Sequence, residues 1–83
     1  MKRILIKHQN YNVERADTLF INEDKIEAIK IVDDRLGEHL HYKIYLITTH
    51  NQYQLIKSAK DCHWDTYDDA IKFLINNKLI NYD

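Results

Sequence analysis

Two histidines separated by one residue, His39 and His41, are the first side chains along the chain that could do chemistry. Residues at this spacing point to one face of an extended strand, where two imidazoles can chelate zinc. Folding could bring Cys62 or His63 to the same place, but a zinc site needs three or four converging ligands and this spacing supplies two. We favour the alternative, two exposed histidines beside a hairpin loop, and predict no cofactor.

Cys62 and His63 form a second candidate, a cysteine nucleophile beside a histidine base and between two aspartates. Adjacent residues on an extended chain point to opposite sides, so this pair is poorly placed to exchange a proton. The sequence shows no recognisable set of donors for an oxyanion. We therefore interpret Cys62 as a small structural residue in a connector and predict no enzymatic activity.

An acidic cluster surrounds the start of the predicted helix. Its members are Asp61, Asp65, Asp68 and Asp69. Their spacing does not match the calcium loop D-x-D-x-D-G, and carboxylates in a first turn are favoured by the helix dipole. The functional alternatives are a cation site or a surface for a partner protein. Trp64 would add an anchor to that surface if it were exposed, although we favour a place for it over one end of the core.

Positive charge is concentrated in two segments. The first 15 residues carry four basic residues against one acidic, and residues 42–60 carry three lysines and no acidic residue. If the first strand lies beside the 42–57 hairpin, a basic sheet face results whose tyrosines could stack on bases. The residues of this predicted face are Arg3, Lys7, Lys43, Tyr45 and Tyr53. Because the net charge is −1, nucleic-acid binding is our alternative hypothesis and not the leading one.

Composition excludes several classes of protein. The chain has 83 residues, which predicts a single domain over residues 1–83. One glycine and no proline exclude a glycine-rich phosphate loop, and one cysteine excludes an intrachain disulfide. No apolar run is long enough for a membrane span or a signal peptide, so we expect a cytoplasmic protein without membrane contact.

The hydrophobic pattern predicts the elements that must position these side chains. Alternating apolar and polar residues indicate five strands, at residues 3–8, 18–22, 27–32, 41–49 and 53–57. Residues 33–38 are typical of a hairpin loop, and residues 9–17 are compatible with a strand or a loop. This order predicts an α+β fold, a small and mostly antiparallel sheet with one C-terminal helix packed on one face.

The predicted helix, residues 66–77, carries its own start and stop signals. Thr66 followed by Asp69 resembles a capping box, and the two asparagines at the end indicate a left-handed stop. A stripe at helical spacing predicts the face that packs on the sheet. Its residues are Tyr67, Ala70, Ile71, Leu74 and Ile75.

Two stretches carry a resemblance to known proteins. Residues 20–29 read FINEDKIEAI and residues 66–74 read TYDDAIKFL, and a hairpin rich in tyrosine and isoleucine lies between them. The pattern, which covers residues 17–80, resembles many small uncharacterised proteins of low-GC Gram-positive bacteria and their phages. The resemblance implies a sheet-plus-helix fold and no defined activity.

A foldable core without recognisable chemistry favours a non-enzymatic protein-binding module. A phage or mobile-element protein of this kind would bind and modulate a host protein, for example as an inhibitor of host defence or replication. An open edge of the first or fifth strand could pair with a strand of the partner. Self-association through the same edge would give a homodimer.

Overall fold

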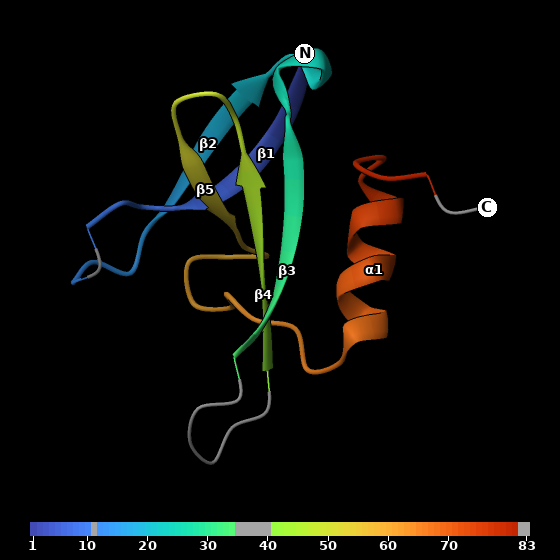
Figure 1. The fold of residues 1–83 in the computed structure, drawn as a ribbon. Coiled ribbons are helices and arrows are strands. Elements are labelled where there is room, and N and C mark those ends of the chain that lie inside the picture. The colour runs from blue at the N-terminus through green and yellow to red at the C-terminus, as the bar shows by residue number, and fades with distance from the viewer. Residues whose placement is uncertain (11, 35–40, 82–83) are drawn as a thin grey trace.

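The computed structural model describes residues 1–10, 12–34 and 41–81, which form one antiparallel sheet with a helix against it (Figure 1). The elements are β1 (Lys2–Lys7), β2 (Ala16–Ile21), a short 3-10 turn (Glu23–Lys25), β3 (Ala28–Asp34), β4 (His41–Ile47), β5 (Gln52–Leu55) and α1 (Tyr67–Asn76). This arrangement confirms the predicted α+β class with five strands and a C-terminal helix. The predicted hairpin loop at residues 33–38 lies mostly outside the described residues. In the described part, no helix has the length and apolar character needed to cross a membrane.

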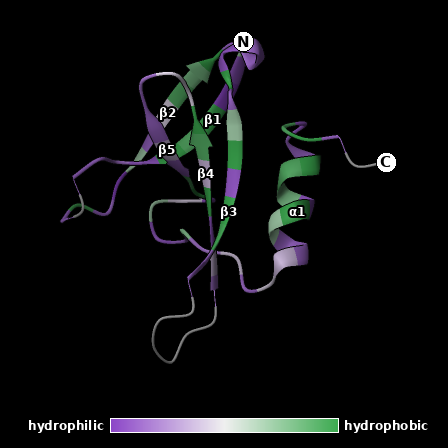
Figure 2. Cartoon of the chain, in the orientation of Figure 1, coloured by the Kyte–Doolittle hydropathy of each residue, from purple (hydrophilic) through white to green (hydrophobic). Residues whose placement is uncertain are grey.

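Strand pairing sorts the side chains onto two faces of the sheet. Ile44 lies opposite Leu55 on β5 and Ile31 on β3, while Ile6 of β1 also lies opposite Leu55. We name the face that carries these residues, and that α1 covers, the core face. The other side is the outer face. Figure 2 shows how apolar residues recur along β1, β4 and α1. The buried core-face residues of the sheet are Ile4, Ile6, Ile21, Ile44, Leu46 and Leu55.

The strand order β2-β1-β5-β4-β3 places β1 beside the β4–β5 hairpin, which meets the condition that the basic-face hypothesis set. The prediction that the first or fifth strand forms an open edge is wrong, because both are interior and the edges are β2 and β3. β1 pairs with β2 along its whole length, from Lys2↔Ile21 to Lys7↔Ala16. Its pairing with β5 is confined to Ile6↔Leu55.

Trp64 returns the chain to the sheet after residues 57–63 have left it. The Trp64 N–H donates to the Tyr42 carbonyl at 3.0 Å, and the Tyr42 N–H donates to the Trp64 carbonyl at 2.8 Å. The tryptophan side chain is 2% exposed, and its ring centroid lies 4.8 Å from that of Phe73 on α1. Trp64 therefore covers the core, and its interpretation as an exposed partner anchor is wrong.

The first turn of α1 is capped as predicted. The Asp69 N–H donates to Thr66 Oγ1 at 3.1 Å, which satisfies one of the free donors at the helix start. The helix buries Ala70 and Leu74 against the sheet.

The predicted stripe of α1 is correct at its centre and wrong at its margins. Tyr67 is 54% exposed and Ile75 is 38% exposed, whereas Phe73 packs against the core. The apolar face is thus rotated toward Phe73. In this orientation the Phe73 ring contacts the Trp64 ring at an interplanar angle of 53°.

The end of α1 is a two-bond motif around a left-handed residue. The Lys78 N–H donates to the Ile75 carbonyl and the Leu79 N–H donates to the Leu74 carbonyl, both at 2.9 Å. Lys78 has φ 57°, whereas Asn77 has φ −91°, so the predicted left-handed stop at the two asparagines is wrong. A lysine in this conformation costs about 1–2 kcal/mol relative to the right-handed region, so contacts elsewhere must hold it.

Lys2 of β1 supplies that contact. Its Nζ donates to the Asn77 carbonyl at 2.6 Å and to the Lys78 carbonyl at 3.3 Å. Because the last turn of α1 has no basic residue of its own, this distant lysine provides the positive charge that a helix C-terminus favours. The bond ties the start of β1 to the end of α1.

Candidate functional site: a cleft between β1 and α1

Cys62 points into its own loop. Its Sγ lies 3.9 Å from the Ser58 carbonyl oxygen and 3.8 Å from the Ala59 carbonyl oxygen, both of which accept from the thiol. The His63 ring instead contacts the His41 ring, with centroids 4.1 Å apart. The thiol and the imidazole that the nucleophile hypothesis paired thus have different contact partners.

Folding does bring His63 to His41, one of the two histidines considered for a metal. His41 Nε2 lies 3.3 Å from Asp34 Oδ2, and the two imidazoles are tilted by 41°. His39 lies outside the described residues. Within residues 1–10, 12–34 and 41–81, no three His, Cys, Asp or Glu side chains are grouped so that they could hold a metal ion. The arrangement is a contact between two tilted imidazole rings, one of which is bonded to a carboxylate.

His63 has a pKa below the ordinary 6.5 of a histidine. Partial burial is the main cause, because it disfavours the charged ring. The positive charges of His41, Lys43 and Lys7 lower the pKa further, and the carboxylate of Asp34 opposes them. Folding thus favours the neutral form of the His63 ring relative to the unfolded chain.

We expect His63→Gln to flatten the pH dependence of stability below about pH 6.5. In the unfolded chain the histidine pKa is about 6.5. Because the folded pKa is lower, the unfolded state takes up the proton first, and the contribution of His63 is complete above that pH and is lost as the pH falls. Urea unfolding between pH 8 and pH 5 would measure the change, with His50→Gln in the exposed β4–β5 turn as the control. If the free energy of unfolding of the His63 variant depended on pH as steeply as that of the native protein, the lowered pKa of His63 would be contradicted.

The acidic cluster lies along the connector and the first turn of α1. Asp61 Oδ1 lies 3.4 Å from Lys57 Nζ. Asp65, Asp68 and Asp69 are exposed, and the last two occupy the first helical turn, where the dipole favours them. The favourable interaction with the helix dipole accounts for Asp68 and Asp69. A partner-binding role for Asp65, Asp68 and Asp69 stays a prediction.

Four of the five residues of the predicted basic face share the outer face. Their strand positions follow from the register, and they are Arg3, Lys7, Lys43 and Tyr45. Tyr53 lies opposite Leu46, which is buried, so Tyr53 belongs to the core face. Its predicted placement beside Tyr45 is wrong, because Gln54 is the β5 residue that lies opposite Tyr45, and Tyr53 therefore points to the core face.

The outer face is partly engaged by the protein itself. Lys43 Nζ lies 2.9 Å from Asp34 Oδ2, and Lys30 Nζ lies 5.8 Å from the Tyr45 ring centroid. The hydrogen bond from Lys43 is the main reason that the pKa of Asp34 lies below its usual 3.8, and His41 lowers it further. A nucleic acid would therefore compete with existing contacts at Lys43 and Tyr45.

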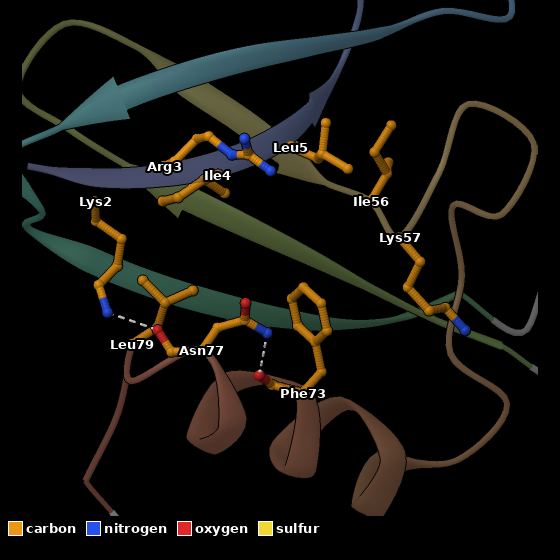
Figure 3. A pocket seen from close by; sticks show the side chains of 9 residues that line it. All are labelled: Lys2, Arg3, Ile4, Leu5, Ile56, Lys57, Phe73, Asn77 and Leu79. Carbon is orange, nitrogen blue, oxygen red and sulfur yellow. Dashed lines mark hydrogen bonds between the residues drawn. The ribbon is translucent and has the colours of Figure 1, made fainter.

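A cleft of about 380 Å³ lies between the first half of β1 and α1. Figure 3 shows Lys2 reaching from β1 to the helix end, and the Phe73 ring rising from α1 toward the sheet. The lining residues are Lys2, Arg3, Ile4, Leu5, Ile56, Lys57, Phe73, Asn77 and Leu79. The cleft thus combines apolar walls with three basic side chains.

The cleft exists because the chain leaves the sheet after β5. The Ile56 N–H still donates to the Leu5 carbonyl at 3.3 Å, but the Lys57 N–H donates to the Asp61 carbonyl at 3.0 Å and turns the chain away. No strand of the described residues continues beside Lys2–Ile4 on this side of β1.

The turn leaves the main chain of Arg3 facing the cleft. Main-chain groups of successive residues in a strand point to alternate sides. In the β1 region the His8 N–H donates to the Arg15 carbonyl on the β2 side, whereas the Leu5 carbonyl accepts from Ile56 on the β5 side. Arg3 follows the alternation of Leu5, so its N–H and C=O point into the cleft. None of the described residues pairs with them across the cleft.

The three basic side chains of the cleft differ in the hydrogen bonds and ion pairs that they make. Lys2 is bonded to the helix end, and Lys57 Nζ lies 3.4 Å from Asp61 and 5.2 Å from the Trp64 ring centroid. Within the described part of the chain, the Arg3 guanidinium makes no ion pair or hydrogen bond. An extended segment in this cleft could therefore bond to the Arg3 main chain, bury an apolar side chain and offer a carboxylate to the guanidinium.

Sequence reasoning identified Arg3 but not the cleft. Its walls come from residues 2–5, 56–57 and 73–79, which no spacing pattern connects. The available signal was the apolar residue Leu79 just beyond the predicted helix, and Leu79 packs against the core.

Comparison with known proteins identifies no relative of this chain. No family model, no curated protein and no solved structure matches the chain. The functional argument therefore rests on the cleft and its contacts.

Proposed function

We propose that the protein is a non-enzymatic protein-binding module that holds an extended segment of its partner in the cleft between β1 and α1. The observation that carries this proposal is the main chain of Arg3, which no described residue pairs on the cleft side and which a partner strand would complete by β-augmentation. Interior strands normally have partners on both sides, so a gap beside β1 is a place where a foreign strand gains hydrogen bonds.

The walls of the cleft suggest the character of the segment. Phe73 and Leu79 offer apolar surface, and Arg3 offers a planar pair of donors suited to a carboxylate. A segment that alternates apolar and acidic residues would place the two kinds of side chain on opposite sides of its strand. A host protein bound by a phage or mobile-element inhibitor would be one partner of this class.

Nucleic-acid binding by the outer face is the second candidate. The shared position of Arg3, Lys7, Lys43 and Tyr45 on that face favours it. The contacts of Lys43 with Asp34 and of Lys30 with the Tyr45 ring weaken it. The experiment below separates the two candidates.

Site-specific photo-crosslinking tests the proposal. In a Cys62→Ser background, a benzophenone maleimide is attached at Lys57→Cys in the cleft or at Lys72→Cys on the exposed side of α1. Each protein is irradiated in lysate of the cells that make it, with and without nuclease. We expect protein adducts from position 57 and not from position 72, with the yield unaffected by nuclease.

Charge reversal in the same assay provides the matched control. Arg3→Glu should reduce the adducts from position 57 by about tenfold or more, because a charge-assisted hydrogen bond contributes about 1.5–3 kcal/mol. Lys30→Glu, a reversal on the outer face, should leave them unchanged. Equal adducts from both probe positions would refute the cleft, and adducts that disappear with nuclease would favour the outer face and a nucleic acid.

A further inference from the structure

β2 is an edge strand with an open row of main-chain groups. Because the His8 N–H bonds to Arg15 on the β2 side, the pairing with β1 uses the main chain of Asp17, Leu19 and Ile21. By alternation, the N–H and C=O groups of the other three residues point away from the sheet. Those residues are Ala16, Thr18 and Phe20, and no described residue bonds to their outward groups.

The two edges of the sheet differ in charge. β3 carries Lys30, Asp33 and Asp34, and charged residues on an edge oppose pairing with other chains. β2 has Asp17 as its one charged residue, and that carboxylate lies 2.7 Å from His8 Nδ1. The β2 edge therefore lacks the protection that the β3 edge has.

An exposed aromatic ring lies on the outer face of the β2 edge. The Phe20 side chain is 61% exposed, although phenylalanine is among the residues most often buried. Its neighbours across β1 include Arg3, which it faces directly, and Leu5, which is 37% exposed. A surface that removes Phe20 from water would gain hydrophobic free energy in addition to the hydrogen bonds of the edge.

We propose that a second copy of this chain pairs with the β2 edge in a symmetric, antiparallel fashion about Thr18. This register places all three residues with outward groups opposite one another, so that three pairs exchange about six hydrogen bonds. Phe20 then faces Ala16 of the partner subunit, a large side chain against a small one. Shifting the register by two residues breaks at least one of these pairs.

The charges permit the same register. On the core side of the edge, Asp17 faces Leu19 of the partner subunit, so like charges are not opposed. Asp17 is also engaged within its own chain, because its Oδ2 lies 2.7 Å from His8 Nδ1 and its Oδ1 lies 3.0 Å from Arg15 Nε. The two-fold contact is isologous, and it makes one continuous sheet across both subunits.

Sedimentation equilibrium over a wide concentration range tests the proposal. We expect the native protein to approach twice the 10.0 kDa mass of one chain. Thr18→Pro removes an N–H that points outward and leaves the β1–β2 ladder intact, because proline is tolerated at such edge positions. This variant should remain monomeric at concentrations at least about tenfold higher. Thr18→Val keeps the N–H and should dimerise like the native protein.

Two paired variants test the register. Ala16→Lys/Phe20→Lys and Ala16→Glu/Phe20→Glu each place like charges opposite one another in the homodimer, so each should be monomeric alone. A mixture of the two should form a heterodimer. Circular dichroism would show that every variant is folded. A native protein that is monomeric throughout, or a Thr18→Pro variant that dimerises normally, would overturn the proposal, and the absence of a heterodimer would overturn the register.

Discussion

Trp64→Ala should lower the free energy of unfolding by about 3–5 kcal/mol, the usual cost of removing a buried aromatic side chain. Trp64 is 2% exposed, contacts the Phe73 ring and re-enters the ladder opposite Tyr42. A domain of this size has a total stability of roughly 4–12 kcal/mol, so the variant should lose a large part of it. Urea unfolding followed by far-ultraviolet circular dichroism would measure the loss, because the variant lacks the single tryptophan.

Trp64→Phe is the matched control for this result. It keeps an aromatic ring against Phe73 and should cost less than the alanine variant. Tyr67→Ala removes a ring that is 54% exposed and should have a smaller effect still. A loss from Trp64→Ala that is no larger than the loss from Tyr67→Ala would contradict the buried position of Trp64.

Leu74→Ala should destabilise the protein by about 2–5 kcal/mol. Leu74 is 1% exposed, and its carbonyl also accepts the Leu79 N–H that closes the end of α1. In a domain of this size each kcal/mol shifts the melting temperature by about 4–8 °C, so a fall of at least about 8 °C is expected. Thermal unfolding by circular dichroism measures it directly.

Ile75→Ala tests which face of α1 is buried. Ile75 is the next residue along the helix and is 38% exposed. Alanine has the better helix propensity, which offsets part of the lost contact, so the net change should be less than about 1 kcal/mol. Equal losses at positions 74 and 75 would mean that the helix is rotated from the orientation described.

The strands and the helix were readable from the sequence because their signals are local. Alternation of side chains marks a half-buried strand, and Thr66 with the following aspartates marks a helix start. The observed strands lie within a few residues of the predicted ranges, and Thr66 caps α1 as expected. Residues 9–17, which the pattern left open, contain the start of β2 at Ala16.

The margins of these elements were less predictable than their centres. The stripe of α1 is rotated toward Phe73, and the left-handed residue at its end is Lys78. Both differences accompany contacts with residues outside the helix, because Trp64 packs on Phe73 and Lys2 donates to the carbonyls of Asn77 and Lys78. Helical periodicity contains no information about such partners.

The sequence alone determined the fold class and the positions of most elements, because short-range periodicity and capping encode them. The tertiary structure decided which strands are neighbours, and with that the cleft beside Arg3, the open edge of β2 and the meeting of His63 with His41. Each of these depends on the register between segments that are separated along the chain. A shift of one residue in that register moves every side chain of a strand to the other face.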